Sequence, residues 1–305
     1  MALDVRVLGA GFAGLAVAHA LRARGVRVGV VDPRGALAGA SGASLGVVLP
    51  GLAEDPDRFA YALGEARAGE LCAFAKCAFA KLPGFARTGV TWRASPEALA
   101  AARRIGLAVA DDVVEDAGTV DLAALRAALA CEVVAAPEPA EVTVWATGWS
   151  PADAWIADKV MPVRWQSLRL AGPSLARPLV TRQTTVIYAG GLDALGARWA
   201  TPHLEVGETE PDPSPAVSAM LERLARQDFP DAGPPGGARA GIVAEACDGL
   251  PVVGPVPGRP REVACVGFGA LGLALLWRCA ESVARGLCEG DDPEVPAALR
   301  SGRFR

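Results

Sequence analysis

The chain has 305 residues, 51% of them hydrophobic and 21% charged, with a formal net charge of −4. This composition is typical of a globular protein with an ample core, and it excludes a disordered chain. The acidic balance, with a pI of about 5.4, excludes broad non-specific binding to nucleic acid but not a local basic patch.

Seven cysteines, an odd number with no Cys-x-x-Cys pair, favour a reduced, cytoplasmic protein. Asp4 and Arg6 argue against a signal peptide at the N-terminus. The apolar stretch Val263–Leu287 is interrupted by glycines and charged residues, so it predicts a strand followed by a buried helix rather than a membrane span. We therefore expect no membrane partner, and no pattern in the chain sets an oligomeric state.

The N-terminal residues predict a strand, a glycine turn, a helix and a second strand that ends at an acid. The strands are Val5–Leu8 and Val26–Val31, and the helix is Leu15–Arg24. Gly9-x-Gly-x-x-Gly14 joins the first strand to the helix, and Asp32 follows the second strand. This order is typical of a βαβ unit that binds a dinucleotide.

Each part of this unit has a mechanical role. Gly9 permits a tight turn, Gly11 lets a pyrophosphate approach the backbone, and Gly14 lets the helix pack closely on the strand. The helix N-terminus presents N–H groups and a positive dipole end to the phosphates. Asp32 is placed to accept hydrogen bonds from a ribose 2′-OH and would repel a 2′-phosphate, so FAD or NAD fits better than NADP. The alternative is a glycine-rich turn with no ligand.

Residues Gly39–Gly46 are small and glycine-rich, which predicts a loop rather than a regular element. This loop is either a flexible surface turn or a second place where a cofactor passes close to the backbone. In the second case, Ser41 or Ser44 would hydrogen-bond a phosphate or cap the next element. The alanine-rich stretch Asp57–Lys81 then predicts a helix.

Short elements follow this helix. They are a strand or hairpin at Phe85–Arg93, helices at Pro96–Arg104 and Asp121–Ala130, and a buried strand at Val142–Trp149. The last of these ends in a turn of small residues, which would bring backbone next to a ligand at the carboxyl edge of a parallel sheet.

The middle of the chain, Pro162–Pro213, is β-prone and predicts a separate antiparallel sheet. Its expected strands are Val160–Leu170, Leu179–Ala189 and His203–Gly207. Arg182, Tyr188 and Arg198 are the candidate substrate contacts in this region.

The C-terminal part returns to alternating helix and strand. The expected elements are a helix at Ala216–Gln227, a loop at Pro230–Gly237, a strand at Glu262–Val266, a glycine turn at Gly267–Gly272 and a long helix at Leu273–Gly286.

Taken in order, these motifs resemble the FAD-dependent oxidoreductases of the D-amino-acid oxidase and glycine oxidase family. Gly9–Gly14 with Asp32 match the dinucleotide fingerprint, and Ala40–Ser44 resembles the loop that lies beside the flavin. Ala146–Gly148 resembles the turn that closes the sheet over the cofactor.

Two later runs, Asp248–Gly254 and Gly267–Leu273, resemble the C-terminal flavin-binding signature of the same family. The run Leu250–Pro255, with the serine-glycine loop, is also similar to the oxidase module that acts on the wobble uridine side chain of tRNA.

The resemblance implies an α/β fold, with a Rossmann-like FAD-binding domain and an inserted, mostly antiparallel β-sheet domain for the substrate. The FAD-binding domain is expected at residues 1–80, 120–158 and 241–305, and the substrate domain at 81–119 and 159–240. The residues expected to bind FAD are Gly9, Gly11, Phe12, Ala13, Gly14, Asp32, Pro33, Arg34, Ser41, Ser44, Thr147, Gly148, Gly267, Gly269, Ala270, Leu271, Gly272 and Leu273.

The family also implies a mechanism in which the flavin, held non-covalently, takes a hydride at N5 from the α C–H of a small-molecule amine. The imine then hydrolyses, and an acceptor, expected to be oxygen, reoxidises the flavin. Gly269–Leu273 would present N–H groups to the N1/C2=O edge of the flavin, where negative charge develops. A neutral amine requires no side-chain acid or base, so no catalytic side chain is assigned.

Two positions depart from the family pattern. The family often carries an arginine, which holds the substrate carboxylate, where this chain has Val243. Valine cannot replace a bidentate guanidinium clamp. The Arg-Gly-Gln step favoured by the family reads Arg164-Trp165-Gln166 here. These departures, with a chain that is short for the family, point away from simple α-amino acids as substrates.

The sequence thus favours an FAD-dependent oxidoreductase acting on an amine or amino acid. One alternative is oxidation of 5-carboxymethylaminomethyl-uridine on tRNA, which is the only nucleic-acid partner we expect. A second is a flavin-binding protein without turnover. His19 and His203 are expected to be structural, and two histidines without clustered carboxylates predict no metal site.

Overall fold

The structure is a computed structural model that describes residues 4–50, 61, 63–136, 139–150, 153–171, 175–181, 187–189, 198–290, 292 and 294–304. At 181, 187–189, 198–204 and 228 only the backbone is described. The start of the predicted helix Asp57–Lys81 therefore lies largely outside the described residues. Within the described part, every helix is too short or too polar to cross a membrane.

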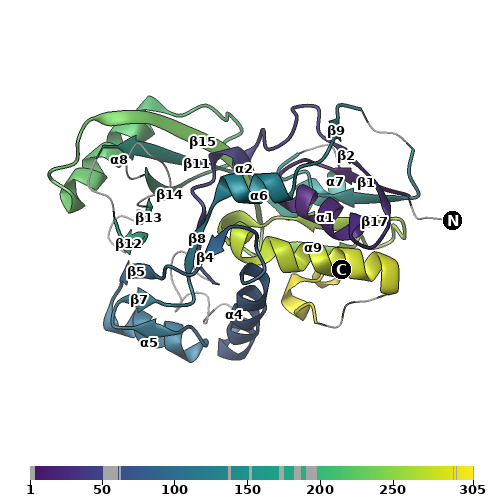
Figure 1. Cartoon of the computed structure of the whole chain (residues 1–305), viewed down its shortest axis with the longest axis horizontal. Helices are drawn as coiled ribbons and strands as arrows, with labels where there is room; N and C mark the ends of the chain where they lie inside the picture. Colours follow the sequence, from purple (N-terminus) through teal and green to yellow (C-terminus); the bar gives the residue numbers. More distant parts are fainter. Residues whose placement is uncertain are drawn as a thin grey trace.

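A six-stranded sheet occupies the end of the molecule that carries the N-terminus (Figure 1), in the order β16-β17-β10-β1-β2-β9. Its strands are β1 (Asp4–Leu8), β2 (Arg27–Val31), β9 (Val133–Val134), β10 (Val142–Trp145), β16 (Val252–Pro255) and β17 (Glu262–Val266). All neighbours pair in parallel except β16, which is antiparallel to β17 at the edge. The carboxyl ends of β1, β2, β10 and β17 therefore meet at one edge of the sheet.

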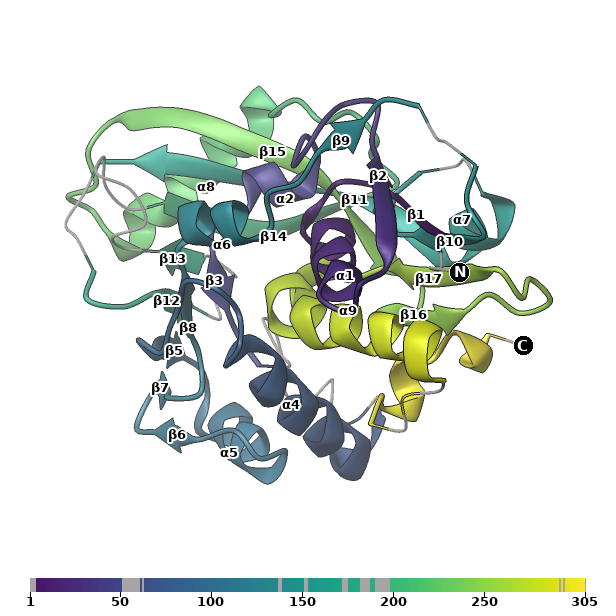
Figure 2. The same ribbon diagram turned by 45° about the vertical axis from the view of Figure 1, so that its right-hand side comes forward.

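Helices cover one face of this sheet. α1 (Phe12–Arg22) and α9 (Gly272–Glu289) pack against each other, and α4 (Glu65–Phe79) packs on α9 (Figure 2). Val263 and Cys265 of β17 belong to the core on this side. Ala264 and Val266 belong to a second cluster, with α7 (Ala154–Lys159) and the adjoining strand ends. β17 is thus buried on both faces, as expected for a parallel sheet.

An eight-stranded sheet forms the other end of the molecule, in the order β15-β11-β14-β13-β12-β5-β7-β6 (Figure 1). Its strands are β5 (Val90–Arg93), β6 (Val109–Ala110), β7 (Val113–Val114), β11 (Val160–Leu170), β12 (Leu179–Thr181), β13 (Ile187–Ala189), β14 (Arg198–Val206) and β15 (Pro235–Ala246). Every pair is antiparallel except β12 with β5. The expected fold class, a parallel α/β sheet with a mostly antiparallel second sheet, is confirmed.

Smaller elements surround the two sheets. α8 (Pro215–Asp228) packs on β11 and β14, and α5 (Pro96–Arg104) on β6. The remaining elements are α2 (Ala40–Ala43), α6 (Leu122–Ala128), the short strands β3 (Val47–Val48), β4 (Phe85–Ala86) and β8 (Gly118–Val120), and the 3₁₀ turns η1 (Gly269–Leu271), η2 (Ala297–Leu299) and η3 (Ser301–Arg303).

Several predicted elements have the bounds that the sequence indicates. α5, β11 and β17 agree with the predicted ranges at both ends. Side-chain caps explain where two helices begin: Ser95 accepts a hydrogen bond from the Ala98 N–H, and Asp121 from those of Ala123 and Ala124.

Two loop predictions are wrong. The stretch Gly39–Gly46 contains the short helix α2, which begins after Gly39 and packs against β15. Pro230–Gly237 was expected to be loop throughout, but β15 begins at Pro235 because Leu170 of β11 pairs with it. Pairing with a distant strand overrides the local preference of Pro and Gly for turns. The expected domain boundary at residue 240/241 lies inside β15.

Candidate functional site

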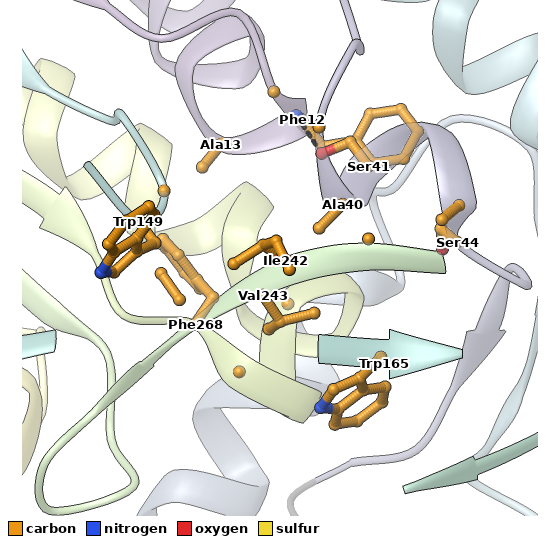
Figure 3. A pocket seen from close by; sticks show the side chains of 18 of the residues that line it. Phe12, Ala13, Ala40, Ser41, Ser44, Trp149, Trp165, Ile242, Val243 and Phe268 are labelled. Atoms are coloured by element: carbon orange, nitrogen blue, oxygen red, sulfur yellow. Dashed lines mark hydrogen bonds between the residues drawn. The ribbon is translucent and has the colours of Figure 1, made fainter. Parts of the chain in front are cut away.

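A cavity of about 410 Å³ opens at the edge where the parallel strands end (Figure 3). One side consists of the segments that follow β1, β2, β10 and β17. The α2 region, β11 and β15 supply the other side. The carboxyl ends of a parallel α/β sheet are the usual ligand site of this architecture.

The glycine turn after β1 brings backbone to the cavity wall. Gly9 has φ +103°, and a Cβ there would lie 2.3 Å from the carbonyl oxygen of Ala146. A Cβ on Gly14 would lie 2.0 Å from the Gly9 carbonyl oxygen, so only glycine allows α1 to pack this closely on the turn. A Cβ on Gly11, by contrast, would approach only Ser41 Oγ, at 3.1 Å. The space beside Gly11 is therefore an open cradle facing the cavity.

Ser41 satisfies a donor at the start of α1. Its Oγ accepts a hydrogen bond from the Phe12 N–H at 2.9 Å (Figure 3), so the α2 region caps the preceding helix and not the next element. Ser44 Oγ accepts from the Gly46 N–H at 3.3 Å. The first turn of α1 also has further N–H groups without intrahelical partners, which favours an anion at this end.

Asp32 lies at the end of β2 and is 7% exposed. One carboxylate oxygen accepts from the Ala10 N–H at 3.1 Å, and the other from the Arg34 N–H at 3.0 Å. The Arg34 side chain lies 3.5 Å from the second oxygen. These contacts hold a fixed negative charge at the cavity, where it suits a hydroxyl donor better than a phosphate.

The turn after β17 supplies another part of this side of the cavity. Gly267 has φ +75° and Gly269 has φ +49°, and between them the chain turns into η1 and then into α9. A Cβ on Gly267 would lie 2.9 Å from Cβ of Ala246. The N-terminus of α9 thus borders the same cavity as that of α1.

Most of the residues predicted to bind FAD line this cavity. They are Gly9, Gly11, Phe12, Ala13, Asp32, Arg34, Ser41, Ser44, Thr147, Gly148, Gly267, Gly269, Ala270, Gly272 and Leu273. The lining does not include Gly14, Pro33 or Leu271. Gly14 lies against the Gly9 carbonyl, and Leu271 is buried in the core with α9.

The structure describes the backbone of two of the three predicted substrate contacts. Arg182 lies outside the described residues. Tyr188 is in β13 and Arg198 in β14, on neighbouring antiparallel strands, and only their backbone is described. Val243, the position of the missing family arginine, does line the cavity (Figure 3).

Several lining residues were not among the predicted site residues. Trp149, Trp165, Ile242 and Phe268 all line the cavity (Figure 3), and so does Pro211. The Trp165 indole Nε1 is buried and has no hydrogen-bond partner within the described part of the chain. The departure Arg164-Trp165-Gln166 marked this position, but the pairing of β11 with β15 that brings it to the cavity was not predicted.

The neighbours of Trp165 hold a nearby loop. Arg164 is buried, and its Nε donates to Glu205 Oε2 at 2.7 Å while Nη1 donates to the carbonyls of Glu210 and Asp212. Gln166 accepts from the Ser214 N–H at 2.7 Å. Together they fix the segment 205–214, which carries Pro211 to the cavity.

The chemistry of the lining favours a bound organic group over a metal ion. Among the described lining residues, the charged side chains are Asp32 and Arg34. No cluster of three metal-ligating side chains occurs in the described part of the chain. Burial raises the pKa of the Cys265 thiol to about 12, so this lining residue is a neutral thiol at physiological pH.

The lining also fits a flavin dinucleotide. The open cradle at Gly11 has room for a pyrophosphate beside the N-terminus of α1, and Asp32 stands where a ribose hydroxyl would need an acceptor. A Cβ on Gly241 would lie 2.9 Å from Cα of Ala40, so β15 and α2 enclose the middle of the cavity closely.

Comparison with known families supports this assignment. The family model described as "FAD dependent oxidoreductase" (DAO) matches residues 4–130 and 112–285 of the chain.

Solved structures have the same fold. Glycine oxidase from Geobacillus kaustophilus is 18% identical, with a TM-score of 0.75, and the match covers 97% of each chain. L-proline dehydrogenase from P. horikoshii is 14% identical, also with a TM-score of 0.75, and the match covers 99% of this chain and 98% of that one.

One curated protein matches over a short stretch. The tRNA 5-methylaminomethyl-2-thiouridine biosynthesis bifunctional protein MnmC of Maricaulis maris (strain MCS10) is 50% identical over 54 residues. That stretch is 18% of this chain and 9% of the relative.

Proposed function

Because the chain belongs to the DAO family of FAD-dependent oxidoreductases, we propose that it holds FAD non-covalently and oxidises a C–N bond of a small amine or amino acid. The observation that carries this proposal is that two helix N-termini, those of α1 and α9, border one cavity. Glycine and L-proline are the substrates in the names of two structural relatives, and both carry an amine.

The residues proposed to hold the cofactor divide by position. The turn Gly9–Ala13, with Ser41, would bind the pyrophosphate, and Asp32 the adenosine ribose. The turn Gly267–Leu273 would present N–H groups to the pyrimidine edge of the flavin, where charge develops on reduction. A neutral, buried thiol at Cys265 is a poor nucleophile, which supports non-covalent binding.

When bound, the flavin supplies the two-electron chemistry, accepting the hydride from the carbon next to the nitrogen. The substrate loses this hydride and one N–H proton and becomes an imine. Water hydrolyses the imine to a carbonyl compound and a free amine, and the two electrons pass to an acceptor, which we propose to be oxygen. The chain's own part is to orient the amine and to exclude water. Trp149, Trp165 and Phe268 favour the exclusion of water because they make the cavity wall apolar.

We also propose a division of labour within the chain. Residues 1–80, 120–158 and 241–305 would carry the cofactor, and 81–119 and 159–240 the substrate, with β15 shared between the two. Arg182, Tyr188 and Arg198 stay the proposed substrate contacts of the second part.

The test is the absorption spectrum of the purified protein. We expect the two absorption bands of oxidised flavin, and we expect anaerobic addition of primary and secondary amines to bleach them. Denaturation should release the flavin into the supernatant if no covalent bond holds it. A colourless protein that takes up no added FAD would overturn the assignment, and a coloured protein that no amine reduces would support flavin binding without turnover.

The short match to MnmC favours a second candidate, oxidation of a modified uridine on tRNA. Two features oppose it: the net charge of −4 and the absence at Val243 of a cation for the carboxymethyl group of that uridine. Filter binding with bulk tRNA at low and raised salt is the check. Binding that weakens steeply with salt would favour the tRNA substrate.

A further inference from the structure

One wall of the cavity is built by the paired strands β11 and β15. Trp165 of β11 pairs with Gly241 of β15, so the two share one face of the sheet, and Val243 and Glu245 follow Gly241 on that face at alternate positions. The face turns toward α2, since a Cβ on Gly241 would meet Ala40. We call Trp165, Val243 and Glu245 the amine wall.

The first two members of the amine wall are apolar and line the cavity (Figure 3). The third is not itself a lining residue but lies beside one: a Cβ on Gly269, which lines the cavity, would lie 3.4 Å from Cγ of Glu245 and 3.7 Å from its Cδ. The carboxyl group of Glu245 is therefore in van der Waals reach of the turn that leads into α9.

Glu245 has no hydrogen bond or ion pair to its side chain in the part of the chain that the structure describes, although the residue is half-buried. Burial raises the pKa of its carboxyl above the ordinary value. Keeping a half-buried carboxylate without a partner is unfavourable, so such groups are concentrated at binding sites, where a ligand supplies the partner.

We infer that the amine wall selects amines that carry no carboxylate, with Trp165 and Val243 contacting an apolar substituent and Glu245 pairing with the substrate ammonium. This inference rests on the proposed function and narrows its substrate class. A carboxylate at Val243 would be buried without a cation and would face the like charge of Glu245, which disfavours α-amino acids. The ammonium form binds first and then passes one proton to water, because the hydride leaves only from the neutral amine.

The test compares benzylamine with benzoate, which share the ring and differ in the sign of the charge. Isothermal titration of the flavin-loaded protein should give a Kd for benzylamine at least about tenfold lower than for benzoate. Glu245→Gln should weaken benzylamine binding about tenfold without weakening benzoate. Glu115→Gln, the same change at an exposed glutamate of β7's C-terminal side, should alter neither.

A gain-of-binding variant gives a second readout. Val243→Arg should strengthen benzoate binding about tenfold, since a guanidinium would then face the carboxylate. Tighter binding of benzoate than of benzylamine by the wild type, or unchanged benzylamine binding by Glu245→Gln, would overturn the inference. If Arg198→Ala then abolished benzoate binding, Arg198 would be the carboxylate partner instead.

These outcomes separate the inference from the proposed function. If amines reduce the flavin but Glu245→Gln leaves the Kd for benzylamine unchanged, the proposed function stands and the inference about the amine wall is wrong. If the protein binds no flavin, the proposed function is wrong, whatever the titration shows.

Discussion

At the scale of single residues, the site depends on three glycines, Gly9, Gly11 and Gly14, which have no side chain. Gly9 and Gly14 lack a Cβ because backbone atoms occupy its place, at 2.3 Å and 2.0 Å. Gly11 is different, since nothing but a serine hydroxyl lies near it and its φ of −74° is open to any residue. Two of the glycines are therefore required by the fold, and the third is required only by what the cavity receives.

This difference predicts the effect of Gly11→Val. The variant should fold but keep less than about a tenth of its flavin, because the valine methyls would occupy the space of the pyrophosphate. The flavin-to-protein absorbance ratio after purification measures this loss. Gly29→Val is the matched control: Gly29 is exposed on β2 with no atom near its Cβ position, so its flavin content should not change. A Gly11→Val protein as yellow as the wild type would contradict the pyrophosphate assignment.

At the scale of elements, β11 connects the wall of the cavity that carries Trp165 to a loop. Arg164 and Gln166 point to one side of the strand and hold the segment 205–214, while Trp165 between them faces the other way. Because side chains alternate between the two faces of a strand, two of these three consecutive residues hold the loop while the third faces the opposite side. The loop they hold brings Pro211 to the cavity.

Arg164→Ala should lower the free energy of unfolding by about 2 kcal/mol, because it leaves Glu205 without its partner in a partly buried site. The value lies below that of a fully buried pair because the Glu205 side chain is 25% exposed. Urea denaturation measures the change. Arg223→Ala, at an exposed position of α8, is the control and should leave the midpoint unchanged.

The same variant should open the cavity. Acrylamide should quench the flavin fluorescence of Arg164→Ala more strongly than that of the wild type, since Pro211 is no longer held in place. Arg164→Lys should restore only part of both effects, because an ammonium can reach Glu205 but cannot span the carbonyls of Glu210 and Asp212 as well. Equal quenching in all three proteins would exclude a role for this loop in closing the site.

At the scale of the whole molecule, α9 links the cavity to the C-terminal segment. Its N-terminus borders the cavity, and further along Arg278 and Arg285 reach Asp292, which is 2% exposed. Arg278 is also hydrogen-bonded to Glu294. The end of the chain is thus held to the helix that would face the flavin.

These contacts give stability a defined dependence on pH. Burial alone would raise the pKa of Asp292, but the Ser282 hydroxyl, the Glu294 N–H and the charges of Arg278 and Arg285 outweigh it, so the pKa is lowered. A carboxyl whose pKa is lower in the folded state stabilises the fold above its unfolded pKa of about 3.9, and this stabilisation is lost as the pH falls through the folded value. The free energy of unfolding should therefore fall as the pH drops below about 4.

Asp292→Asn should reduce this acid dependence. At pH 7 we expect the variant to be about 1 kcal/mol less stable than the wild type, and the difference should shrink as the pH falls toward 2. Urea unfolding at a series of pH values measures both. Asp111→Asn, an exposed position whose φ of +53° suits asparagine, should leave the pH profile unchanged. A constant difference between the Asp292 variant and the wild type at all pH values would contradict the assignment.

The sequence by itself determined the N-terminal βαβ unit, because strand, glycine turn, helix and acid are contiguous and each carries its own local signal. It also determined the bounds of α5, β11 and β17, where caps and apolar runs agree with the final fold. Only the tertiary structure decided the length of β15 and the composition of the amine wall. Trp165 and Val243 are far apart in the chain and meet through strand pairing, which depends on register and burial across the whole sheet rather than on neighbouring residues.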